Sequence, residues 1–430
     1  MKFFYQYKWH IWYILLVGIY LLFAFRSMSA PMPLRFLYVF LWIFPGLKER
    51  EWLPGAISIP YIILNYCGGM GDLLPSHTDF YILIGILICL FVPYSYHQSK
   101  IPKSIFLFLF YTTFINLIID INGVFMPIVW SSILLICSFY LYKSTEKSKN
   151  CLSFQLICLC FVLSICFIFL RQNFDAYSVE LSDLEETRTG WMDPNYFGTV
   201  LGMGAVCAIV EVRKSSYNVI FRMLYIAVVI AAIIALFLNA SRGALLAFAA
   251  SLVCILLFSK VKLYKKIFSI LVIVGFLIYL YNNAYMDILE YRLQNDELTG
   301  SRMDIWIRKM NSFFSDYDLM NWIFGVGNTE VEYLGNWQTS VHNDFISCFI
   351  QYGIIGLTIY VALIFYPIIR LYSIRKTCLD TLTATIYLIV SLLSLNPITG
   401  GQYPYFFFLL YIYSLFGVEK STNLTSPKFN

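Results

Sequence analysis

The stretch that decides the fold is a pair of apolar runs joined by a short polar turn: MLYIAVVIAAIIALFL at 223–238, NASRG at 239–243 and ALLAFAASLVCILLFS at 244–259. Neither apolar run contains a charged residue, and each is close to the length of a helix that crosses the hydrocarbon core of a bilayer. Such a segment must satisfy its backbone hydrogen bonds internally, and a helix does so within one segment. The stretch therefore predicts two membrane-spanning helices joined by a tight hairpin.

The same pattern recurs along the 430 residues, which are 60% hydrophobic and 13% charged and have a mean hydropathy of +0.71. We predict an all-α polytopic integral membrane protein with about 12–14 transmembrane helices. The candidate spans are 9–25, 34–47, 53–66, 80–96, 104–119, 124–142, 152–170, 195–212, 219–238, 244–259, 267–283, 345–369, 381–395 and 405–417. Pro45 and Pro60 interrupt the second and third spans, and a re-entrant pair there would give the lower count. The first span lacks a small-residue cleavage site, so we expect it to remain as a helix.

Lysine and arginine divide between the two sides of this predicted topology. With the N-terminus inside, sixteen lysines and five arginines fall on the inner side. The outer side has eight arginines and one lysine, Lys309. Inward lysines report orientation, whereas outward arginines run against the positive-inside bias. Because a guanidinium grips phosphate bidentately and an ammonium does not, we expect an outer substrate that carries phosphate.

The spans divide the chain into three parts. Residues 1–283 form transmembrane helices with an acidic outward loop near 171–194, residues 284–344 form one large outward loop, and residues 345–430 form the C-terminal spans. The large loop contains a predicted amphipathic helix from Ser301 to Phe314, with Met303, Trp306, Ile307 and Met310 on one face. We therefore expect this loop to be ordered over the outer mouth of the bundle.

The eleven cysteines lie almost entirely in apolar stretches, which predicts small buried side chains rather than disulfides or ligands. The sequence has no His/Cys spacing suited to zinc, so we expect no metal and no cofactor.

Two outer stretches lead directly into spans. TRTGWMDPN at 187–195 ends in Pro194, a good first residue for a helix whose N–H groups then face an anion. NASRG at 239–243 places Arg242 near the hydrocarbon, which is costly unless the side chain snorkels or meets an anion. Arg188 and Arg242 are thus candidate anion-binding residues. The alternatives are a carboxylate partner for Arg188 and lipid headgroups for Arg242.

Two further stretches lie within the large loop or at its end. TGSRMDIW at 299–306 places Arg302 in the first turn of the amphipathic helix, and SVHNDF at 340–345 ends the loop. A histidine at the membrane surface, such as His342 beside Asn343 and Asp344, can act as a general base near neutral pH. The alternatives are a solvated arginine at an ordinary helix start and a helix-capping cluster with an incidental histidine.

These stretches form a series: an arginine before a Pro-Asn helix start, a Ser-Arg-Gly hairpin, FGVGN at 324–328, and His-Asn followed by QYGIIG at 351–356. Their order resembles the O-antigen polymerase and O-antigen ligase superfamily. The resemblance covers residues 185–370 in detail and the rest of the chain in topology only.

The resemblance implies a bacterial inner-membrane enzyme with both termini in the cytoplasm, acting at the periplasmic face without metal or nucleotide sugar. It assigns the substrate pyrophosphate to Arg188 and Arg242, with Arg302 at a position that is often basic in the family. It assigns activation of the acceptor to His342. The supporting residues are Asn195, Asn343 and Asp344.

The function expected from this resemblance is a polysaccharide polymerase that transfers a glycan from undecaprenyl pyrophosphate to the terminal sugar hydroxyl of another lipid-linked repeat unit. A ligase that uses lipid A–core as acceptor stays open, because the same motifs fit it. A flippase for lipid-linked sugars is disfavoured, since charges within the spans are scarce. Expected partners are lipid-linked oligosaccharide, membrane lipids and a chain-length-regulating membrane protein, and no nucleic acid is expected.

Overall fold

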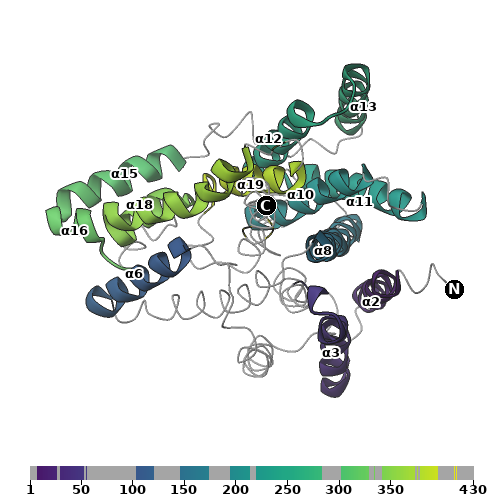
Figure 1. The fold of residues 1–430 in the computed structure, drawn as a ribbon, viewed down its shortest axis with the longest axis horizontal. Helices are drawn as coiled ribbons and strands as arrows, with labels where there is room; N and C mark the ends of the chain where they lie inside the picture. The colour runs from purple at the N-terminus through teal and green to yellow at the C-terminus, as the bar shows by residue number, and fades with distance from the viewer. Residues whose placement is uncertain are drawn as a thin grey trace, which may run out of the picture. The chain divides into compact units, whose positions relative to one another are not determined.

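The computed structural model describes residues 7–26, 30–52, 55, 103–120, 146–173, 194–213, 219–282, 302–328, 334, 341–372, 375, 378–395, 411 and 413. All regular structure in these residues is helical and none of them lies in a strand, which confirms the predicted fold class (Figure 1). The candidate spans 80–96 and 124–142 fall outside the described residues, as do 53–66 and 405–417 except for residues 55, 411 and 413, so the number of spans stays a prediction.

Every other candidate span coincides with a helix. The helices are α2 (Lys8–Phe25), α3 (Met32–Lys48), α6 (Lys103–Ile119), α8 (Glu146–Asn173), α10 (Pro194–Val212), α11 (Val219–Asn239), α12 (Arg242–Phe258), α13 (Leu263–Asn282), α18 (Asp344–Tyr372) and α19 (Leu379–Leu392). Five of these are both long and apolar enough to cross a membrane, namely α2, α8, α10, α11 and α18. The chain is therefore a polytopic membrane protein.

The chain divides into two compact units, of which unit 1 comprises residues 1–94 and 143–290. The most buried helices of unit 1 are α8 and α10, with α11 and α12 packed beside them. The cysteines that the structure describes are all buried, as their apolar surroundings predicted.

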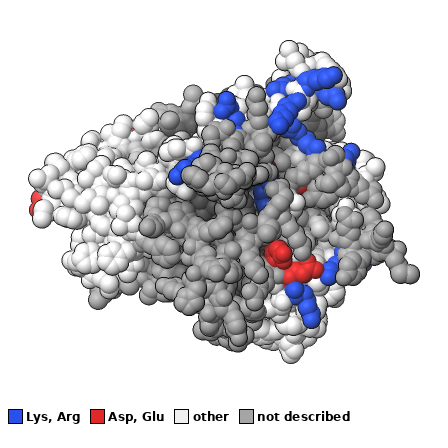
Figure 2. Space-filling view, in the orientation of Figure 1, with Lys and Arg blue, Asp and Glu red and all other residues white. Residues whose placement is uncertain are grey.

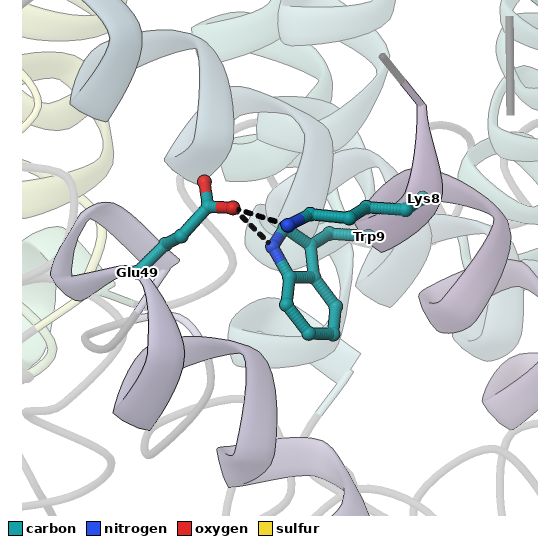
Figure 3. Close-up of polar contacts among 3 residues, drawn as sticks. All are labelled: Lys8, Trp9 and Glu49. Atoms are coloured by element: carbon teal, nitrogen blue, oxygen red, sulfur yellow. Dashed lines mark hydrogen bonds and ion pairs between the residues drawn. The ribbon is translucent and has the colours of Figure 1, made fainter. Parts of the chain in front are cut away.

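A small polar cluster joins α2 and α3, the N-terminal hairpin of unit 1, at one end (Figure 3). Glu49, directly after α3, accepts a hydrogen bond from Trp9 Nε1 at 2.8 Å and pairs with Lys8 Nζ at 2.9 Å. The start of α2 and the end of α3 thus lie side by side, so the two helices run in opposite directions, as alternating spans require.

A lysine-rich turn joins α12 to α13, and its lysines lie on the surface (Figure 2). It contains Lys260, Lys262, Lys265 and Lys266. A basic turn between two apolar helices is the usual mark of a cytoplasmic loop.

Unit 2 comprises residues 95–142 and 291–430. Its central helix is α18, against which α6, α19, α15 (Arg302–Asp316) and α16 (Leu319–Phe324) pack. Residues 302–316 form the predicted amphipathic helix, and the four residues predicted on its apolar face differ in their surroundings. Trp306 and Met310 pack on a core around the buried Phe313, whereas Met303 and Ile307 are exposed.

Helix α18 is broken at Gly353, which has φ 65° and ψ −170°. The break deprives the carbonyls before it of their usual helical N–H donors. N–H groups of the glycine segment after α16 take the place of those donors. Val326 N–H donates to Ile350 O at 3.1 Å and Gly327 N–H donates to Gln351 O at 3.0 Å. A side chain on Gly325 would collide with Gln351 O, so only glycine permits this approach. The predicted glycine break in QYGIIG is thus a docking point for the FGVGN turn.

A buried polar network connects this docking point to α6. Tyr352 Oη donates to Asn328 Oδ1 at 2.7 Å, and Asn328 N–H donates to Asn116 Oδ1 at 3.2 Å. Tyr111 Oη donates to Tyr352 O at 3.0 Å. Segments more than 200 residues apart in the chain are thereby held together in unit 2.

Candidate functional site

Two predicted site regions have defined geometry, one in each unit. In unit 1, the site region is the corner where the N-termini of α10 and α12 meet. Ser241 caps α12, because its Oγ accepts from Ala244 N–H at 3.5 Å. The same hydroxyl donates to Asn195 Oδ1, in the first turn of α10, at 3.1 Å. The predicted supporting residue Asn195 is thus joined directly to the arginine hairpin.

The close approach of these helix ends depends on Gly198. A Cβ atom there would lie 2.7 Å from Asn239 Nδ2 and 2.9 Å from Ala244 Cβ. Ala240, in the turn itself, has a left-handed backbone with φ 50° and is fully buried. The hairpin is therefore packed tightly enough to fix the backbone that carries Arg242.

Arg242 is the first residue of α12 and is half-buried. The positive end of a helix dipole disfavours a cation in the first turn. Two such positive ends, from α10 and α12, gather at this corner. A corner with this electrostatic character is suited to an anion, and the arginine adds the bidentate fork that phosphate prefers.

In unit 2, the site region is the junction between the large loop and α18. Asn343 Oδ1 accepts from Phe345 N–H at 3.0 Å and from Ile346 N–H at 3.1 Å, which makes Asn343 the N-cap of α18. Its Nδ2 donates to Leu393 O at the end of α19, at 3.2 Å. Arg302 Nη1 donates to the adjacent carbonyl, Ser394 O, at 3.0 Å. Arg302 and Asn343 thus converge on neighbouring carbonyls.

His342 lies between two residues whose positions are fixed. Val341 is buried and its carbonyl accepts from Trp306 Nε1 at 2.8 Å, while Asn343 caps α18. His342 itself has φ 50°, in the left-handed region. Among the described residues, Ala240 and His342 are the two non-glycine residues with positive φ. Such a backbone costs of order 1–3 kcal/mol, and residues of this kind cluster at active sites.

Asp344 is fully buried in the first turn of α18, and its Oδ2 accepts from Tyr360 Oη at 2.7 Å. This contact ties the start of α18 to a residue four turns along the same helix, across the break at Gly353. The geometry suits a structural support for the histidine segment.

The structure brings together Asn195 with the Arg242 hairpin in unit 1, and Arg302, His342, Asn343 and Asp344 in unit 2. Arg188 lies outside the described residues. Sequence reasoning missed the positioning contacts of Ser241 and Trp306. The cap signature of Ser241 before Arg242 was visible in the sequence, but the partner of Trp306 was not, because Val341 is 35 residues away.

No curated protein matches the chain. Residues 226–361 match the family model described as O-antigen ligase. The matched stretch contains Arg242, Arg302, His342, Asn343 and Asp344, and it ends within α18. The family indicates O-antigen polymerase or ligase activity in a bacterial inner membrane. Residues 226–361, 136 of the 430 residues, are thus similar to the O-antigen ligase family.

Proposed function

We propose that the protein is a polysaccharide polymerase that acts on undecaprenyl-pyrophosphate-linked glycans at the periplasmic face of the inner membrane. Arg188, Arg242 and Arg302 bind the pyrophosphate of the donor, and His342 activates the acceptor hydroxyl. The reaction uses the chain's own side chains and no metal or cofactor.

The proposed transfer is one displacement at the anomeric carbon. The acceptor oxygen forms a bond to that carbon while the bond from the carbon to the pyrophosphate oxygen breaks. The electron pair leaves with the pyrophosphate, whose charge the arginines stabilise. The hydroxyl proton passes to the imidazole of His342. Attack opposite the leaving group inverts the anomeric configuration.

The observation that carries this proposal is the backbone of His342. Its left-handed conformation is maintained by Val341 on one side and by Asn343 on the other, with Arg302 directed at the same junction. A solvated, incidental histidine would relax to an ordinary backbone. The strain is explained if the histidine must present one ring nitrogen at a fixed position.

The ligase is the second candidate, because the matching family model is described as O-antigen ligase. The two activities share the donor and differ in the acceptor. Purified protein is supplied with lipid-linked repeat units alone, and separately with repeat units and lipid A–core. A ladder of lengthening glycans on gels without lipid A–core is the result expected for the polymerase. Transfer that occurs only when lipid A–core is present would establish the ligase instead.

Topology provides an independent test. The lysine distribution predicts that α15 faces the periplasm and that the C-terminus is cytoplasmic. Reporter fusions at Asn311, within α15, and at Asn430 should score as outside and inside, respectively. An inside score at Asn311 would place His342 on the wrong side of the membrane for a periplasmic substrate and would end the proposal.

A further inference from the structure

Helix α15 has three distinct faces. One is buried in the protein and contains Trp306, Lys309 and Phe313. A second is polar and exposed, and it consists of Asp304, Arg308, Asn311 and Ser315. The third is apolar and also exposed: Met303, Ile307 and Phe314 are 47%, 50% and 45% accessible.

The order of these faces around the helix is informative. At about 100° per residue, the exposed apolar face lies between the buried face and the polar face. A helix on a water-covered protein surface needs only a buried and a polar side. A helix at the boundary of protein, lipid and water needs all three, in the order that α15 shows.

The exposed apolar face continues onto α16. Leu319 and Met320 are 63% and 62% accessible, and the Phe314 ring meets the Trp322 ring edge-on with centroids 5.2 Å apart. The indole Nε1 of Trp322 is buried and has no hydrogen-bond partner among the described residues. An aromatic residue in these apolar surroundings is typical of the membrane interface.

The same surface joins the lipid-facing sides of the spans in unit 2. At the end of α16, Phe324 O accepts from Tyr111 Oη of α6 at 3.4 Å. Next to Tyr111, Phe110 is 70% accessible and stacks on the exposed Phe114. Figure 1 shows α15 and α16 beside α18, and the face of this region that Figure 2 shows is mostly uncharged, with acidic atoms at its tip. An exposed apolar area that is continuous with membrane-spanning helices is covered by the medium that covers those helices.

We propose that α15 and α16 lie in the surface of the phospholipid bilayer, with Met303, Ile307, Phe314, Leu319 and Met320 in contact with the acyl chains. Arg308, on the adjoining polar face, reaches the lipid phosphates. Because Trp306 on the buried face holds Val341, this anchorage fixes the height of His342 above the membrane. The inference concerns lipid contact alone and does not depend on the reaction.

Site-specific photo-crosslinking tests this inference. Benzoylphenylalanine is placed singly at Met303, Ile307, Phe314 or Met320 in the full chain, in nanodiscs of phosphatidylethanolamine and phosphatidylglycerol. Asn311 and Ser315, on the polar face of the same helix, are the matched negative positions, and Phe110 on α6 is the positive one. After irradiation, intact-mass spectrometry should show lipid adducts at the four apolar positions and at Phe110, and at most one tenth as much at Asn311 and Ser315.

Three outcomes would overturn the inference. The first is an adduct at Phe110 with none at the four apolar positions. The second is equal labelling of the apolar and polar faces, which would remove the predicted orientation. The third is crosslinking of the apolar positions to a second copy of the chain, which would make this face a protein interface. All the substituted positions are exposed on the described surface, so each variant is expected to fold.

Discussion

Replacing His342 with alanine is expected to abolish glycan transfer while the protein still binds its lipid-linked donor. Loss of one positioned base typically slows a reaction by about 10²–10⁴-fold. Donor binding should persist, because the arginines are unchanged. The measurement is polymer formation by purified protein with lipid-linked repeat units, combined with a donor-binding assay on the same preparation.

The left-handed backbone at this position needs its own control. His342→Asn is suitable, because asparagine tolerates positive φ and has no base near neutral pH. If the chemistry requires imidazole, the asparagine and alanine variants should be equally inactive. Activity retained by His342→Asn would show that the backbone conformation alone matters, and it would exclude His342 as the general base.

EDTA should leave the native enzyme active, and inhibition by EDTA would contradict the metal-free mechanism.

Replacing Arg242 with lysine is expected to be nearly as damaging as replacing it with alanine. A point charge cannot form the two parallel hydrogen bonds of a guanidinium, and each charge-assisted hydrogen bond contributes about 1.5–3 kcal/mol. The loss of one such bond lowers affinity by about 10–100-fold, and each variant should lose at least this much affinity for the pyrophosphate-linked donor.

The control for this experiment is Arg370→Lys, an exposed arginine in the last turn of α18. This variant should bind the donor like the native protein. If Arg242 only snorkels to lipid headgroups, lysine serves equally well, and an Arg242→Lys variant with native affinity would remove Arg242 from the site.

The transmembrane helices could be predicted because length and apolar content alone specify them. Helix α11 begins and ends within one residue of its prediction, and α12 differs by only two residues at its start and one at its end. The face of α15 could not be predicted in the same way. Its apolar residues follow one periodic pattern, yet Trp306 faces the protein and Ile307 does not, because a pattern of hydrophobicity does not distinguish protein from lipid.

The residues of the candidate site could be predicted from the sequence, but the contacts between them could not. Arg242, Arg302 and His342 stood out because of their chemistry and their predicted side of the membrane. The bond between Ser241 and Asn195 spans 46 residues, and that between Arg302 and Ser394 spans 92. Pairings of this range follow from the packing of whole helices, which one sequence does not encode in any local pattern.

The break in α18 has a consequence for how the chain is made. Carbonyls of a broken helix cost several kcal/mol each when they enter hydrocarbon without partners. The groups that satisfy Ile350 O and Gln351 O are the N–H groups of Val326 and Gly327, which leave the ribosome before the carbonyls do. Tyr111, whose hydroxyl donates to Tyr352 O, is synthesised earlier still. The order of translation therefore supplies the donors of these three carbonyls before α18 is made.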